Sequence, residues 1–208
     1  MTVTEVKKEK KHLMRLLFDN GSELLLDTDV YSDNALCVGS KLSLEDIEEL
    51  SFQSDYSRAK SRALWYLDRS DYTEKALFTK LLRAGFKKEA SAAVIGRLTE
   101  LGVVDDLRFA ERFAERCCEN NISKREALHK MLEKGVSYDM AKQVLEELET
   151  DEGEQLNALI EKKYAYKLTQ QNGVERVFAA LVRKGFSYSA VRAALKKYTE
   201  ELEFSEEY

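Results

Sequence analysis

The chain has 208 residues, of which 44% are hydrophobic and 34% are charged, and its formal net charge is −5. The apolar share is enough to form a core, which excludes global disorder, and the absence of proline excludes Pro-rich linkers and collagen-like segments. No apolar run is long enough to span a bilayer, and the charged N-terminus lacks the apolar segment of a signal peptide. We therefore expect a cytoplasmic protein that does not bind a membrane.

Residues that could support catalysis or bind a metal are scarce. The cysteines are Cys37, Cys117 and Cys118, the histidines are His12 and His129, and none lies in a metal-binding motif. Glycine-rich phosphate loops and the nucleophile elbow of hydrolases are also missing. We predict that the protein is not an enzyme and holds no metal and no cofactor.

The first 55 residues combine short strands with one short helix. Alternating apolar residues predict strands over 3–8, 13–18 and 23–26, with a turn at 19–22. Ser43 is a good N-cap for a short helix that ends at Leu50. We expect a small β element that packs on the region that follows.

A repeat with a period of 50 residues organises most of the remaining chain. Gly85, Gly135 and Gly185 each follow a similar apolar segment, and the windows 77–98 and 177–198 are identical at seven of 22 positions. A glycine just after a helix can adopt left-handed dihedral angles and form a Schellman motif, with an apolar contact across the turn. Each repeat is therefore predicted to consist of two helices, a tight glycine turn and a third helix.

The expected fold class is mainly all-α, with three tandem three-helix repeats in an elongated curved array and a small N-terminal β element. Thr73, Ser123, Ser137 and Ser187 are expected to be N-caps, whereas Lys87 is a poor one. The predicted helices are 57–69, 73–84, 88–101, 105–119, 124–134, 138–149, 154–168, 173–184 and 188–199. The predicted domains are residues 1–55 for the β element and short helix, 56–103, 104–152 and 153–199 for the repeats, and 200–208 for an acidic, partly disordered tail.

Charge is unevenly distributed along the chain. Residues 58–98 carry 10 basic and 4 acidic side chains, a net charge of +6, whereas residues 1–57 carry a net charge of −6. A basic segment in an acidic protein favours a polyanionic or acidic partner, although a solvated helix face would explain it equally well. The aromatic residues Trp65, Tyr66 and Tyr72 lie near basic side chains, and we interpret them as core residues and helix-end anchors rather than base-stacking platforms.

Three segments, in this order, resemble the RecX family of bacterial recombinase regulators. They are Ala63–Ser70, Leu77–Phe86 and Leu101–Ala110, and the last contains the sequence Leu-Gly-Val-Val-Asp-Asp-Leu-Arg-Phe-Ala. The resemblance implies a cytosolic regulator that binds the RecA recombinase, typically as a filament on single-stranded DNA, and restrains filament growth, ATP hydrolysis and strand exchange. We expect it to act as a monomer that bridges neighbouring recombinase subunits.

Basic side chains are the candidates for contact with such a partner, because they would steer the approach to an anionic surface. The predicted partner-binding residues are Arg58, Arg62, Arg69, Lys80, Arg83, Lys87, Lys88, Arg97, Arg108, Arg112, Arg116 and Arg125. Direct binding of DNA is expected to be weak, since the chain is acidic overall. The alternatives are a helical adaptor with an unrelated partner and a direct nucleic-acid-binding protein with helix-turn-helix-like units.

Overall fold

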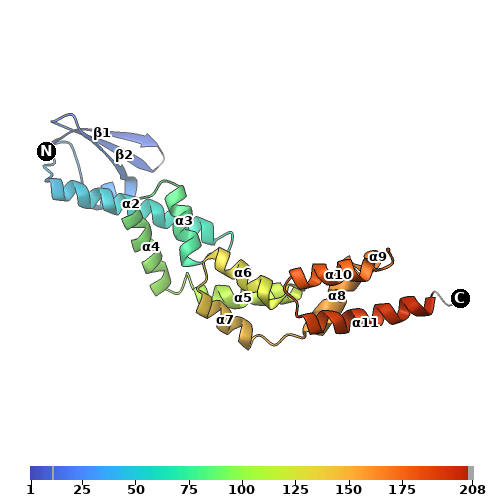
Figure 1. Ribbon diagram of the computed structural model, residues 1–208. Helices are drawn as coiled ribbons and strands as arrows, with labels where there is room; N and C mark the ends of the chain where they lie inside the picture. The colour runs from blue at the N-terminus through green and yellow to red at the C-terminus, as the bar shows by residue number, and fades with distance from the viewer. Residues whose placement is uncertain (11, 206–208) are drawn as a thin grey trace. The chain divides into compact units, whose positions relative to one another are not determined.

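The computed structural model describes the backbone of residues 1–10 and 12–205 and the side chains of residues 1–9 and 12–198. The chain divides into two compact units, Met1–Asp105 and Asp106–Tyr208. Over the described residues the fold is mainly helical, with eleven helices and one three-stranded sheet (Figure 1), which confirms the prediction of a mainly all-α fold with a small N-terminal β element. None of the helices in this part of the chain is long and apolar enough to cross a membrane.

The N-terminal sheet is an antiparallel meander of β1 (Val3–Lys10), β2 (Leu13–Phe18) and β3 (Glu23–Asp27). Gly21 adopts φ +79° in the turn between β2 and β3, at the predicted turn signal. One face of the sheet buries Val3, Leu16, Phe18 and Leu26. The three predicted strands are thus confirmed, with small differences at their ends.

Two helices of the first unit depart from the expectation. A short helix, α1 (Thr28–Asp33), follows β3 directly and was not predicted; Asp27 caps it by accepting a hydrogen bond from the Asp29 N–H. The predicted helices at 43–50 and 57–69 are wrong as separate elements, because α2 runs without a break from Leu44 to Leu67. Residues 51–56 contain neither glycine nor proline, so nothing interrupts the backbone hydrogen bonds between the two predicted segments. The Ser43 N-cap is confirmed and forms a capping box with Asp46.

The remaining helices follow the predicted repeat. In chain order they are α3 (Glu74–Arg83), α4 (Lys88–Glu100), α5 (Asp106–Glu119), α6 (Lys124–Lys134), α7 (Tyr138–Glu147), α8 (Glu152–Lys163), α9 (Ala165–Leu168), α10 (Gly173–Arg183) and α11 (Tyr188–Ser205). The predicted helix 154–168 is divided at Tyr164 into α8 and α9. The tail was expected to be partly disordered from residue 200, but α11 continues to Ser205; the last three residues of that prediction lie outside the described range.

All three repeat glycines have the predicted left-handed backbone, with φ of +90°, +98° and +95° at Gly85, Gly135 and Gly185. In each turn the glycine N–H donates to the carbonyl three residues earlier, and the next N–H donates to the carbonyl five residues earlier. These two bonds define the Schellman motif. The apolar residues across each turn are Leu81 with Phe86, Met131 with Val136, and Leu181 with Phe186.

Side-chain caps at Thr73, Ser123, Ser137 and Ser187 are confirmed, and Lys87 provides none. Each repeat buries its own cluster of apolar side chains, and the N-terminal sheet has another. Within the second unit, the glycine turn of the third repeat contacts the start of α6. There Ser123 Oγ donates to the Lys184 carbonyl at 2.5 Å, and Lys184 Nζ lies 3.9 Å from Glu126 Oε2.

Candidate partner-binding surface

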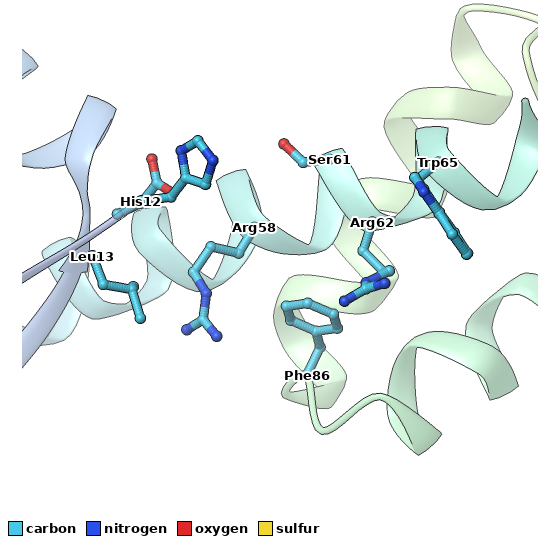
Figure 2. A pocket seen from close by; sticks show the side chains of 8 residues that line it. His12, Leu13, Arg58, Ser61, Arg62, Trp65 and Phe86 are labelled. Carbon is cyan, nitrogen blue, oxygen red and sulfur yellow. The ribbon is translucent and has the colours of Figure 1, made fainter. Parts of the chain in front are cut away.

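Three residues of α2 lie on one face of that helix, and a fourth lies just beyond its last residue, Leu67. Arg58, Arg62 and Trp65 are separated by four and three residues, a spacing that places them in one stripe, and Arg69, in the turn after the helix, places its guanidinium group over the Trp65 ring. Figure 2 shows Arg58, Arg62 and Trp65 projecting from this helix. We call these four residues the α2 stripe.

Trp65 lies at the centre of the α2 stripe and is 46% exposed. The guanidinium carbons of Arg62 and Arg69 lie 5.5 Å and 3.7 Å from its ring centroid, within the range of cation–π attraction. Arg69 also donates to the Trp65 carbonyl at 2.9 Å. Tyr66 and Tyr72 pack against the core, as predicted, whereas Trp65 is half exposed and lies outside the core.

A pocket of about 420 Å³ opens beside the α2 stripe. Its lining residues are His12, Leu13, Asp27, Arg58, Ser61, Arg62, Trp65 and Phe86. Phe86 comes from the glycine turn between α3 and α4, and in Figure 2 its ring lies between the Arg58 and Arg62 side chains. The Arg58 guanidinium carbon is 5.8 Å from the centre of that ring. The pocket therefore combines two guanidinium groups with aromatic walls.

The predicted cations of α2 and of the turn between α3 and α4 differ in their partners. Lys87 Nζ lies 3.2 Å from Asp55 Oδ2 and donates to Ser51 Oγ at 3.2 Å, and Arg58 is 3.8 Å from Asp55. In contrast, Arg62, Arg83 and Lys88 form no ion pair with any side chain that the structure describes. The unpaired cations can bind an anion without first breaking an ion pair.

Two further predicted residues of the first unit are held by neighbours. Lys80 Nζ lies between two aromatic rings, 4.7 Å from the centre of Tyr66 and 4.8 Å from that of Tyr72. Arg97 Nη1 lies 2.9 Å from Glu100 Oε2 on the same helix.

The other four predicted residues belong to the second unit. Arg108, Arg112 and Arg116 are exposed and follow one another at four-residue intervals along α5, so they share a face. Arg125 instead lies at the contact between the second and third repeats, where its Nη2 donates to the Val182 carbonyl at 3.5 Å. Its position gives it a structural role.

One basic cluster was missed by the sequence analysis. Lys167, Arg176 and Arg183 line a second pocket, of about 380 Å³, in the third repeat. Counting charge by segment hid the cluster, because residues 137–208 carry a net charge of −4. The available signal was the spacing of Arg176, Ala180 and Arg183, which puts two arginines and a small residue on one helix face.

Among the described residues, no group of three or more His, Cys, Asp or Glu side chains is placed so that it could hold a metal ion. Cys117 is buried, as expected of a core residue, and burial raises the pKa of its thiol. His129 is exposed on α6 beside Glu133.

Comparison with known proteins shows which family the chain resembles. The sequence profile of the first three-helix domain of RecX matches residues 59–98, and that of the third three-helix domain matches residues 150–195. Proteins named regulatory protein RecX match along almost the whole chain. The chain therefore resembles the RecX family. The regulatory protein RecX of Clostridium tetani is 25% identical in sequence, over 95% of this chain and 93% of its own length. That of Lactococcus lactis subsp. cremoris SK11 is 27% identical, over 99% of this chain and 78% of its own length.

Solved structures of RecX proteins share the fold. A crystal structure of regulatory protein RecX superposes with a TM-score of 0.69 at 18% identity, covering 94% of this chain and 98% of the other. RecX from Lactobacillus salivarius gives a TM-score of 0.60 at 23% identity, over 69% of this chain and 96% of the other. The shared name describes regulatory proteins and not an enzyme.

Proposed function

We propose that this protein binds the RecA recombinase filament on single-stranded DNA and restrains its ATP hydrolysis and strand exchange. Similarity to the RecX family and the name regulatory protein RecX of its relatives support a regulatory role. The partner is the one that the family resemblance implies. Since RecA acts on DNA inside the bacterial cell, the proposal also implies a cytoplasmic protein.

The observation that carries the proposal is the α2 stripe with its pocket. Arg58 and Arg62 flank the Phe86 ring, and the half-exposed Trp65 ring lies next to them. A guanidinium group can hold a carboxylate through two parallel hydrogen bonds, and the exposed rings can bury an apolar neighbour of that carboxylate. The surface therefore suits an acidic segment with apolar residues on a RecA subunit. Exposed aromatic and arginine side chains are also the residue types that most often dominate binding energy.

Most of the other predicted cations would act mainly by steering the protein towards the filament. In the first unit these are Arg69, Lys80, Arg83, Lys87, Lys88 and Arg97, and in the second they are Arg108, Arg112 and Arg116. Such peripheral charges change the association rate and its salt dependence more than the final affinity. Arg125 would contribute only through the contact between the repeats.

The direct test is to titrate the purified protein into RecA that is hydrolysing ATP on single-stranded DNA. The double variant Arg58→Gln/Arg62→Gln should need at least tenfold more protein for half-inhibition, which corresponds to about 1.4 kcal/mol. The difference should be largest at low salt, where charges are least screened. Lys60→Gln/Lys75→Gln is the matched control, because it removes two positive charges from the same unit outside the α2 stripe and should inhibit like the parent.

Reversing the turn cluster Arg83, Lys87 and Lys88 to glutamate is a second, coarser test. At Lys87 the new carboxylate would face Asp55, so circular dichroism must first establish that the variant is folded. A parent protein that leaves RecA turnover unchanged and is not retained by RecA filaments would refute the proposal. The helical adaptor with another partner would then be the better interpretation.

A further inference from the structure

The second pocket lies in the third repeat, between the end of α8, the short α9 and one face of α10. Its lining residues are Tyr164, Lys167, Gln170, Arg176, Val177, Ala180 and Arg183. Three of these side chains are cationic and none is acidic. Among the side chains that the structure describes, none forms an ion pair with Lys167, Arg176 or Arg183.

The α10 helix arranges two of the cations around a hollow. Arg176, Ala180 and Arg183 are four and three residues apart, so they lie on the same face, and the two arginines are separated by about 10 Å along the helix axis. Ala180 lies between them and leaves the space that a longer side chain would fill. The Lys167 Nζ atom lies 5.4 Å from the centre of the Tyr164 ring, and both residues line the same pocket.

The helix dipole explains the positions of Lys167 and Arg183 but not that of Arg176. Lys167 lies in the last turn of the short α9 and Arg183 in the last turn of α10, where a cation interacts favourably with the helix dipole. Arg176 is near the opposite end of α10, only three residues after the first residue of the helix, where the dipole disfavours a cation. An anion in the pocket would compensate both this placement and the mutual repulsion of the three cations.

We infer that the pocket formed by Lys167, Arg176 and Arg183 binds the backbone phosphates of single-stranded nucleic acid. A row of phosphates suits cations spread along a helix better than one carboxylate does, because each nucleotide brings a further negative charge. The Tyr164 ring and the Gln170 amide offer a stacking surface and a hydrogen-bonding group for an unpaired base. This site belongs to the protein itself and does not depend on the proposed binding of RecA.

The test measures binding of a fluorescent 12-nucleotide thymidine strand to the full chain, by anisotropy, in the absence of RecA. Arg176→Gln/Arg183→Gln should weaken binding at least tenfold at about 50 mM salt. The slope of log affinity against log salt should also fall by about 1.4, since each phosphate contact contributes about 0.7 for a single strand. Loss of fold alone would not produce a graded change in this slope, and circular dichroism checks the fold independently.

Lys142→Gln/Arg192→Gln is the matched control. It removes two positive charges from positions fifty residues apart on α7 and α11, outside the pocket, and should bind like the parent. An abasic strand should bind about fivefold more weakly than the thymidine strand, and Tyr164→Leu should abolish that difference.

Three results would overturn the inference. The first is a folded Arg176→Gln/Arg183→Gln variant with the affinity and salt slope of the parent. The second is competition by thymidine monophosphate or pyrophosphate at the same phosphate concentration as the strand, which would assign the pocket to a small free anion. The third is equal competition by polyglutamate, which would assign it to an acidic protein segment.

Discussion

The α6 and α10 helices occupy equivalent places in the second and third repeats, yet the equivalent exposed faces differ in charge. Glu126, Lys130 and Glu133 lie on one face of α6, and Lys130 pairs with Glu126 at 2.7 Å. Fifty residues later the same positions hold Arg176, Ala180 and Arg183, whose cations face a hollow without a paired acid among the described side chains. Both helices end in the same Schellman motif.

The buried positions of the two helices change much less. Ala127 and Val177, Met131 and Leu181, and Val136 and Phe186 are equivalent pairs, and all six side chains are buried. The comparison shows that the repeat constrains the apolar stripe and the turn, because these determine packing, while each exposed face is free to change. Equivalent helices of one scaffold can therefore serve different partners.

The two helices also begin differently. α6 has Ser123 as its N-cap, whereas the equivalent position of α10 is Gly173, which follows Asn172 in the left-handed conformation. A Cβ atom at position 173 would lie against the Lys167 carbonyl oxygen and 2.9 Å from that of Leu168. The close approach of α9 to the start of α10 thus requires glycine, and it holds Lys167 at the pocket.

The largest effect is expected from Gly173→Ala. The methyl group would collide with backbone atoms that cannot move without separating α9 from α10, so the free energy of unfolding should fall by about 3 kcal/mol. Urea denaturation followed by circular dichroism measures the change. Gly96→Ala is the control: it lies inside α4 with open space around it and should stabilise the protein by about 0.5–1 kcal/mol. Equal stabilities for the two variants would refute the requirement for glycine at 173.

A smaller difference should separate the glycine turns of the first and third repeats. Gly85→Ala should cost about 1 kcal/mol, because alanine is strained at φ +90° but its Cβ would meet no atom within 4 Å. Gly185→Ala should cost about 2–3 kcal/mol, because its Cβ would also lie 2.7 Å from Ser123 Oγ and 2.9 Å from Arg125 Cβ. Urea denaturation of both variants tests this, and equal losses would mean that the turn contact with α6 contributes nothing to stability.

The last prediction concerns the reactivity of the cysteine thiols and not the stability of the fold. Position 117 in the second repeat is equivalent to Lys167 in the third, but its thiol is buried, and desolvation raises its pKa above the ordinary value. A raised pKa means less thiolate at a given pH, so Cys117 should react with iodoacetamide at pH 8 at least tenfold more slowly than the exposed Cys37. Peptide mapping by mass spectrometry measures both rates. Similar rates in the native protein would contradict the prediction, whereas similar rates in urea are expected.

The sequence by itself determined the parts of the fold that depend on neighbouring residues along the chain. The fifty-residue period identified Gly85, Gly135 and Gly185, and the Schellman motif could be predicted because only glycine adopts its left-handed position without strain. The same holds for the serine and threonine N-caps, since a cap acts on N–H groups two or three residues away. Segment-level charge likewise identified the basic region that contains the α2 stripe.

Only the tertiary structure decided which of these side chains have partners. α2 continues through residues 51–56, and this continuous helix positions Asp55 to pair with Lys87, which comes from a turn 32 residues later. Arg125 lies against the third repeat, and Phe86, from the turn after α3, lies against Arg58 of α2. Each depends on residues that are distant in sequence, and local patterns carry no information about such contacts because only the packing of one element on another brings those residues together.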